Sequence, residues 1–324
     1  MELQEIDIRE IEGIRLGNAE DLEAGTGCTV VMCEKGATPG VEVRGGAPGT
    51  RETDLIRSEN LVDKIHAVVL AGGSAFGLEA ASGVMKYLEE KGVGIEVGKV
   101  KVPIVASAIL FDLSVGNPYR RPDFEMGYRA CVNAEKGIFE CGSKGAGTGA
   151  TVGKLFGMNR AMKSGIGCYA IKAGELKVGA VVAVNALGDV IDPETGEILA
   201  GLLDEKKRIL VGTEREIVKN IKPERDIFKG NTTIGVVVTN ALITKPEANR
   251  IAMMAHNGYA RAIRPVHTMF DGDTVFVMGT GEVRVDITAL AVLAVMAVEK
   301  AVVKAVIEAD SIHGLKSYKD LKKV

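Results

Sequence analysis

A threonine at the start of a predicted strand is the candidate nucleophile of this sequence. Thr232 follows the turn signal Gly230-Asn231 and opens the β-branched run 232–239, which predicts a buried strand. A hydroxyl in that place is held by its backbone and aimed by the turn before it, as a nucleophile with one fixed position must be. The segment alone favours a plain junction between a loop and a strand, so the interpretation depends on the other polar residues.

Four further residues complete a possible hydrolytic site. Asp271 and Asp273 place two carboxylates in one tight turn that opens a strand, Asn185 closes the apolar strand 178–184, and Lys154 follows a glycine-rich loop. Taken singly, they fit a plain turn, a strand-end amide and a solvated ammonium. Together they predict that a threonine hydroxyl attacks an amide. An amide side chain and an ammonium would stabilise the oxyanion, and carboxylates would orient the proton carrier.

Other motifs match known sites only in part. Residues 145–150 fit the loose dinucleotide pattern G-x-G-x-x-A, but no convincing strand precedes them. Lys154 follows Gly153 without the Ser or Thr of a phosphate-binding loop. Ser74 nearly fits a nucleophile elbow, but Phe76 stands where the second glycine belongs. The four histidines are scattered along the sequence and form no metal-binding pair; they are His66, His256, His267 and His313.

The elements that must position these residues mix strands and helices without strict alternation. Strands are predicted at 11–15, 25–34, 41–43, 67–70, 165–173, 176–186, 232–239 and 273–278. Helices are predicted at 78–91, 122–136, 247–262 and 286–309, the last capped by Asp286. The charged segment 204–225 is predicted to be a flexible linker with some helix. This pattern indicates an α/β or α+β fold with layered sheets.

Composition narrows the class of protein and its partners. The 324 residues carry a formal net charge of −3, with 26% charged and 46% hydrophobic residues, which is typical of a soluble globular protein. Nothing in that balance favours a nucleic-acid or membrane partner. The five cysteines are odd in number without Cys-x-x-Cys spacing, and the first residues are charged, unlike a signal peptide. We therefore expect buried, reduced thiols and a cytoplasmic location.

Five stretches of the sequence resemble one known family. They are 71–78 (AGGSAFGL), 145–154 (GAGTGATVGK), 178–186 (VGAVVAVNA), 230–241 (GNTTIGVVVTNA) and 264–275 (RPVHTMFDGDTV). The chain resembles the self-processing family of the L-aminopeptidase D-amidase/esterase, which includes β-peptidyl aminopeptidases. The likeness is greatest to the branch of nylon-oligomer (6-aminohexanoate-oligomer) endohydrolases, with Thr after Asn and a downstream Asp-Gly-Asp. Other branches have Ser and Ser-x-Glu there, so Thr232, Asp271 and Asp273 depart from them.

The resemblance implies a fold, a cleavage and an assembly. The fold would be a four-layer αββα sandwich, N-terminal-nucleophile-like and shared with ornithine acetyltransferases, with 1–324 as a single domain. The precursor would cut itself between Asn231 and Thr232 into a long chain, 1–231, and a short chain, 232–324. The processed chains would assemble into a homo-oligomer, for which we expect a tetramer.

The resemblance also implies a role for each site residue. The new α-amino group of Thr232, with an unperturbed pKa of roughly 7.7–8.0, would take the hydroxyl proton near neutral pH. Asp271 and Asp273 would hold the ammonium and the hydroxyl. Asn185 would donate to the oxyanion and Lys154 would add positive charge, with no metal and no cofactor. Small peptides, amino-acid amides, β-peptides and ω-amino acid oligomers all fit as substrates, with exo or endo cleavage open.

Two other functions fit the sequence. An acyltransferase of the ornithine acetyltransferase type would use the same fold and the same threonine nucleophile. A non-catalytic binding protein would stay uncut and use the glycine-rich loop 145–150 for a nucleotide. An amine acceptor offered with an acyl donor separates the first from a hydrolase, and nucleotide titration tests the second.

Overall fold

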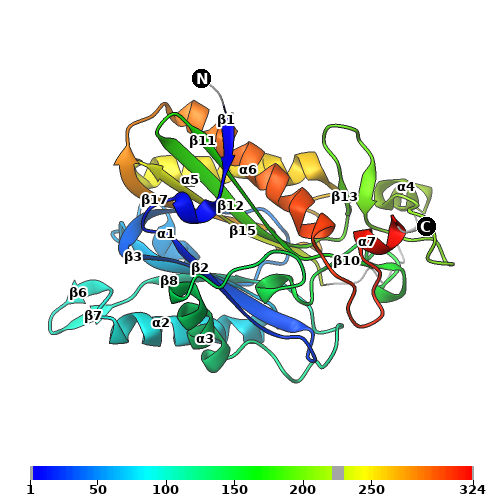
Figure 1. Ribbon diagram of the computed structural model, residues 1–324, viewed down its shortest axis with the longest axis horizontal. Coiled ribbons are helices and arrows are strands. Elements are labelled where there is room, and N and C mark those ends of the chain that lie inside the picture. Colours follow the sequence, from blue (N-terminus) through cyan, green and yellow to red (C-terminus); the bar gives the residue numbers. More distant parts are fainter. Residues whose placement is uncertain (1–2, 221–229, 323–324) are drawn as a thin grey trace.

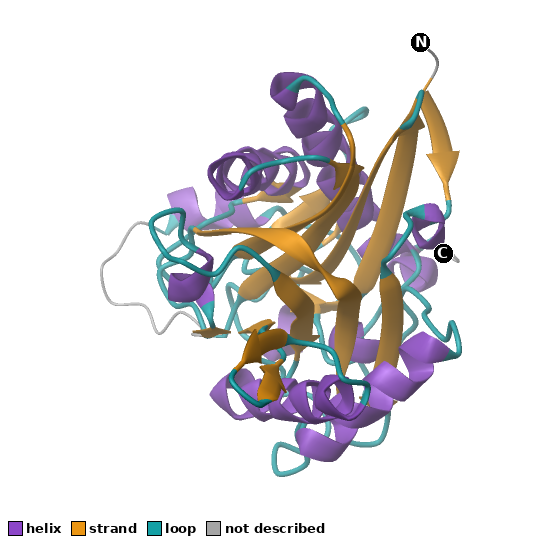
Figure 2. Cartoon of the chain, turned by 90° about the vertical axis from the view of Figure 1, so that its left-hand side faces the viewer, coloured by secondary structure: helices purple, strands orange, loops and turns teal. Residues whose placement is uncertain are grey.

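The computed structural model describes residues 3–220 and 230–322, in which two β-sheets lie between layers of helices (Figures 1 and 2). In spatial order, the first sheet contains β1 (Leu3–Ile6), β11 (Ile166–Ala173), β12 (Leu176–Asn185), β15 (Thr232–Ala241), β17 (Thr274–Val283) and β3 (Thr26–Val43). Its neighbouring strands are antiparallel, except that β15 and β17 run parallel. All ten residues of β15 are buried, which confirms the strand predicted from its β-branched run.

The second sheet shares strand β3 with the first. In spatial order, it contains β2 (Arg15–Asp21), β3, β5 (Ile65–Ala71), β8 (Val105–Ile109) and β4 (Thr50–Arg51). Residues 26–32 of β3 pair with β2 and residues 28–32 pair with β5, whereas 38–43 pair with β17 of the first sheet. The strands predicted separately at 25–34 and 41–43 are therefore two parts of one 18-residue strand.

The predicted strand at 11–15 is wrong. Residues 11–14 form a turn in which Gly13 takes a φ of +82°, and β2 begins only at Arg15. The structure instead has the edge strand β1, which no sequence pattern predicted. Three of its four residues are exposed, so it lacks the apolar run from which strands are predicted.

Two pairs of helices cover the outer faces of the sheets. Helices α5 (Lys245–Ala262) and α6 (Ile287–Ile307) pack on the first sheet, and α2 (Ala80–Glu90) and α3 (Phe124–Glu135) pack on the second (Figure 1). The predicted cap of α6 is confirmed, because the Asp286 carboxylate accepts a hydrogen bond from the Ala289 N–H at 2.8 Å.

The remaining elements are short and lie at the edges and ends of these layers. The helices are α1 (Thr53–Ile56), α4 (Thr213–Lys219) and α7 (Tyr318–Leu321), and the 3-10 turns are η1 (Ile8–Glu10), η2 (Ser74–Glu79), η3 (Gly145–Gly147) and η4 (Met158–Arg160). The strands are β6 (Ile95–Val97), β7 (Val100–Val102), β9 (Thr151–Val152), β10 (Met162–Lys163), β13 (Asp189–Ile191), β14 (Ile198–Ala200) and β16 (Ile263–Arg264).

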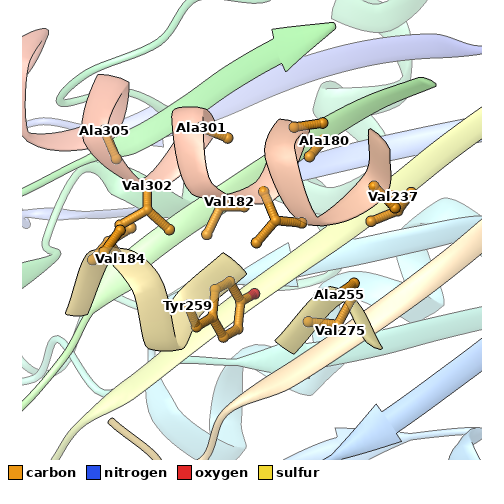
Figure 3. Packing of buried hydrophobic residues seen from close by; sticks show 14 of the residues in the cluster. Ala180, Val182, Val184, Val237, Ala255, Tyr259, Val275, Ala301, Val302 and Ala305 are labelled. Carbon is orange, nitrogen blue, oxygen red and sulfur yellow. The ribbon is translucent and has the colours of Figure 1, made fainter. Parts of the chain in front are cut away.

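Three buried clusters fill the three spaces between four layers. On β12, Val182 and Val184 point to the helices and pack near Tyr259 and Val302 (Figure 3). The alternate residue Val181 points to the other sheet and joins the cluster between the two sheets. A third cluster lies between the second sheet and α2 and α3. The layers are therefore helix, sheet, sheet and helix, which confirms the αββα sandwich and the α/β fold class.

The described part of the segment 204–225 is packed more closely than a flexible linker. Leu203 and Leu210 form an antiparallel bridge, and helix α4 follows. Thr213 is buried, and its hydroxyl donates to the Asp189 carboxylate at 2.6 Å. The predicted helix content is confirmed by α4, whereas 221–225 lie outside the described residues.

The prediction of buried, reduced thiols holds only in part. All five cysteines are free thiols, and Cys28, Cys33 and Cys131 are buried. Cys141 and Cys168 are partly exposed, so the predicted burial is wrong for these two.

In the stretches 3–220 and 230–322, no helix combines the length and the apolar character needed to cross a membrane.

Candidate active site

The ends of neighbouring strands bring the five predicted site residues into one region. Thr232, the first residue of β15, pairs across the sheet with Asn185, the last residue of β12. Asp271 bridges to the residue before Thr232, and Asp273 directly precedes β17, the other neighbour of β15. Lys154 follows β9 and reaches Asn185 with its ammonium. Asn185 and Thr232, which are 47 positions apart in the sequence, thus meet because their strands are adjacent in the sheet.

The Thr232 hydroxyl lies against the peptide bond that precedes it. That bond is intact in this structure, and the Thr232 side chain donates a hydrogen bond to the Asn231 carbonyl oxygen. The same oxygen accepts the Gly272 N–H at 2.9 Å. Thr232 is only 4% exposed, so water has little access to its hydroxyl.

Asn185 uses both ends of its side-chain amide. Its Oδ1 accepts the Thr151 N–H at 3.0 Å and the Lys154 ammonium at 2.8 Å. Its Nδ2 donates to the carbonyls of Phe111 at 3.0 Å and Gly230 at 3.1 Å. Because the acceptors and donors around it differ in kind, the orientation of the amide group is fixed.

Lys154 is fully buried and surrounded by neutral oxygens. Its Nζ donates to the Asn185 carbonyl at 2.7 Å, to the Asn185 Oδ1 at 2.8 Å and to the Gly230 carbonyl at 3.1 Å. Burial lowers the pKa of Lys154 well below its usual value, and nearby carboxylates, Asp271 above all, oppose that fall. Three acceptors need three N–H groups, which only the ammonium form provides. The geometry therefore fits a protonated Lys154.

Asp271 is held by the turn in which it lies. Its Oδ2 accepts the Thr268 N–H at 3.0 Å and the Thr268 hydroxyl, and its Oδ1 accepts the Leu187 N–H at 3.3 Å. Burial, and next the neighbouring charge of Asp273, raise the pKa of Asp271 to about 6. This carboxyl group is therefore poised to change its protonation just below neutral pH.

Asp273 has a histidine partner that the sequence did not reveal. Its Oδ1 accepts the Thr233 N–H at 2.7 Å, and its Oδ2 accepts the His267 N–H at 3.1 Å and contacts the His267 Nδ1 at 2.8 Å. The His256 ring lies 4.8 Å from the His267 ring, and burial lowers the pKa of His256 to about 4. Although His256 and His267 are separated in the sequence, the fold thus brings their rings into contact, and His267 also contacts Asp273.

Gly272 lets the backbone approach the nucleophile. A Cβ at this position would stand 2.6 Å from the Ala47 carbonyl oxygen and 3.0 Å from the Thr232 Oγ1. The loop around Ala47 follows the Asp-Gly-Asp turn closely, since the Ala47 N–H donates to the Asp271 carbonyl at 2.8 Å. Only a glycine fits between this loop and the hydroxyl, which explains the middle residue of the motif.

Two buried charged residues near the site were missed. Asp112 accepts the Thr26 hydroxyl at 2.6 Å and the Gly73 N–H at 2.7 Å, and burial raises its pKa to about 6. Lys163 donates to the carbonyls of Gly147 at 2.8 Å and Ala150 at 3.1 Å. A carboxylate directly after the apolar run 102–111 could have indicated Asp112, whereas no local signal marks Lys163.

The glycine-rich loop is part of the buried framework. The Gly145 N–H donates to a Glu20 carboxylate oxygen at 3.1 Å, and the Ala146 N–H donates to the Thr29 hydroxyl at 3.1 Å. A phosphate at these amides would meet the charge of Glu20, and the loop carbonyls point to Lys163 instead. This geometry weighs against the nucleotide-binding interpretation.

Access to the site is limited, and a metal cluster is not apparent in the described stretches. Asp271 and Asp273 are each 1% exposed. A cavity of about 780 Å³ lies elsewhere, lined by residues such as Phe76, Tyr119 and Arg121. Within 3–220 and 230–322, no three His, Cys, Asp or Glu side chains are grouped so as to hold a metal ion. Thr232, Asp271 and Asp273 are therefore shielded from solvent in this structure.

Comparison with known proteins identifies the relatives of this chain. Residues 7–319 match the model of peptidase family S58. An uncharacterized aminopeptidase of Mycobacterium leprae is 40% identical over 344 residues, covering 96% of this chain and 92% of that protein. A 6-aminohexanoate-oligomer endohydrolase of Paenarthrobacter ureafaciens is 32% identical over 275 residues, covering 84% of this chain and 74% of that protein.

Solved structures show the same fold. The L-aminopeptidase D-Ala-esterase/amidase of Ochrobactrum anthropi, described as a variant of the Ntn hydrolase fold, superposes with a TM-score of 0.73 at 16% identity. The match covers 97% of this chain and 92% of that one. The match to peptidase family S58 and the curated relatives confirm the family resemblance inferred from the five sequence stretches.

Proposed function

Since the chain belongs to peptidase family S58 and is thus a peptide or amide hydrolase, we propose that Thr232 is its nucleophile. We further propose that the chain frees Thr232 by cutting itself after Asn231. Its substrates would be small peptides, amino-acid amides or ω-amino acid oligomers, the last because a 32%-identical relative is a 6-aminohexanoate-oligomer endohydrolase.

One contact carries this proposal. The Thr232 hydroxyl is hydrogen-bonded to the carbonyl of Asn231, the carbonyl that self-cleavage would attack. The Gly272 N–H donates to the same oxygen at 2.9 Å, where a peptide under attack develops negative charge. Nucleophile, target and a hydrogen-bond donor are thus assembled around one peptide bond.

The remaining residues fit the chemistry that follows cleavage. The new α-amino group of Thr232, with an ordinary pKa of roughly 7.7–8.0, would act as the base for its own hydroxyl. Asp271 and Asp273, which flank Gly272 in one turn, would hold the α-amino group and the hydroxyl of Thr232. Asn185 and Lys154 would donate to the oxyanion of the substrate, and water would then release the acyl group.

A denaturing gel with intact mass measurement tests the cleavage. Wild-type protein of 34.2 kDa should give pieces of roughly 24 and 10 kDa in proportion to chain length, the smaller beginning at Thr232. Thr232→Ala should stay intact and lose amidase activity. Thr239→Val is the matched control, because Thr239 is a buried threonine farther along the same strand. A cut, active Thr232→Ala protein would overturn the proposal.

Assays with an added amine separate hydrolysis from transfer. Glutamate offered with an acyl donor should leave hydrolysis dominant; acyl transfer that outruns hydrolysis would favour the acyltransferase alternative. The native mass of the processed protein tests the expected homo-tetramer.

A further inference from the structure

Two adjacent carbonyls before the nucleophile are bound by different donors. The Gly230 carbonyl oxygen accepts the Asn185 Nδ2 at 3.1 Å and the Lys154 Nζ at 3.1 Å. An amide and an ammonium converging on one carbonyl oxygen form the arrangement expected of an oxyanion site. The carbonyl that occupies it, however, lies one residue upstream of the bond to be cut.

The carbonyl of Asn231 is bound on the other side. Its oxygen accepts the Gly272 N–H at 2.9 Å and the Thr232 hydroxyl. Neither Asn185 nor Lys154 is among the hydrogen-bond donors to this oxygen. The backbone N–H of Gly272, in the Asp-Gly-Asp turn, would therefore stabilise the negative charge that develops on this oxygen during self-cleavage.

We propose that self-cleavage and substrate turnover use two separate oxyanion sites. The Gly272 N–H serves the first, and Asn185 with Lys154 serves the second, which the Gly230 carbonyl occupies until the chain is cut. This inference rests on the proposed function, because it assumes that Thr232 performs both reactions.

The cleavage step is an acyl shift followed by hydrolysis. The Thr232 Oγ bonds to the Asn231 carbonyl carbon, the C–N bond between these residues breaks, and the hydroxyl proton ends on the freed nitrogen. Water then adds its oxygen to the ester carbon and returns a proton to the Thr232 Oγ. The products are an Asn231 carboxyl group and a free Thr232 amine, so atoms and charge balance.

The occupied second site also explains how the uncut chain would be kept inactive. A substrate carbonyl cannot reach Asn185 and Lys154 while the Gly230 carbonyl lies between them. Cleavage at the next peptide bond releases the end of that segment and allows it to leave. The protein's own chain thus acts as a temporary occupant of the substrate site.

Two variants test the separation. Lys154→Met and Asn185→Ala should each cut themselves within about tenfold of the wild-type rate, measured by time-resolved cell-free synthesis and gel analysis. Each should hydrolyse a chromogenic amino-acid anilide at least about 100-fold more slowly, the loss typical of a missing oxyanion donor. Lys163→Met is the matched control, because it empties another buried lysine position without touching Gly230.

The outcomes are distinct. Parallel loss of cleavage and turnover in a folded variant would overturn the separation and leave the proposed function standing, whereas an uncut wild-type chain would overturn both. If neither variant folds, calorimetry on the uncut Thr232→Ala chain decides instead. It should not bind the anilide at ten times the wild-type KM, and wild-type-like binding would contradict an occupied site.

Discussion

Lys154 and Lys163 are both fully buried, yet they are held in different ways. Each places its Nζ among backbone carbonyls, and burial lowers the pKa of both. The carbonyls around Lys163 belong to residues at most 16 positions away in the sequence. Those around Lys154 belong to Asn185 and Gly230, which are 31 and 76 positions away.

Under the proposed function, this difference separates a buried charge that only stabilises the fold from one that takes part in the reaction. Lys163 ties one loop to itself and contacts nothing at the cleavage point. Lys154 joins segments that meet only in the folded sheet, and one of its acceptors lies two residues before Thr232. Burial and a lowered pKa are common to both, so the origin of the acceptors distinguishes the two roles.

The strongest test of this contrast is the loss of turnover at Lys154. Lys154→Met should reduce kcat/KM for amide hydrolysis by at least about 100-fold, because an oxyanion donor is removed. Steady-state kinetics on the processed protein measure this. A variant that keeps more than a tenth of the wild-type kcat/KM would remove Lys154 from the chemistry.

A smaller effect, on stability, is expected at Lys163. Lys163→Met leaves buried carbonyls unpaired, at about 1–3 kcal/mol each, and this loss is partly offset because an ammonium no longer has to be buried. The melting temperature should fall by roughly 5 °C, measured by calorimetry. Turnover per folded molecule should stay within about tenfold of wild type; a loss as large as that of Lys154→Met would abolish the contrast.

A third effect, on the pH dependence of stability, tests the comparison through Asp271. Asp271 opposes the fall in the pKa of Lys154 and is not among the charges that act on Lys163. Its own pKa is about 6 when folded and 3.8 ordinarily, so the folded state binds more protons between these values. Its contribution to stability therefore falls as pH rises through that window.

Asp271→Asn should abolish this decrease in stability with rising pH. The variant should gain up to about 3 kcal/mol at pH 7 relative to wild type when both are referenced to pH 4. Urea unfolding at several pH values measures the difference. Identical pH dependence in both proteins would mean that Asp271 is ionised as easily when folded as when unfolded.

The elements of the fold were predictable where local signals were strong. The β-branched run of β15 and the Asp286 cap of α6 depend on neighbouring residues, and both are confirmed. The continuity of β3 was not predictable, because residues 35–40, which include two glycines and a proline, separate the two predicted strands. The exposed edge strand β1 gave no apolar pattern at all.

At the candidate site, too, residue types were predictable from the sequence, whereas contacts set by the fold were not. Residue types and family resemblance selected Thr232, Asn185 and Lys154, which the structure places in one hydrogen-bonded region. The donor on the Asn231 carbonyl is the backbone N–H of Gly272, and a backbone group has no residue type to recognise. The contact of His267 with Asp273 depends on the fold of the turn between them, which spacing alone does not reveal.

The position of β15 in the sheet has a consequence for refolding. It lies between β12 and β17, and β17 lies between β15 and β3, so a piece beginning at Thr232 would supply two interior strands and the helices α5 and α6. Neither piece could complete the sheet by itself. Cleavage would therefore turn a unimolecular folding reaction into a bimolecular one, and recovery after heating would depend on protein concentration.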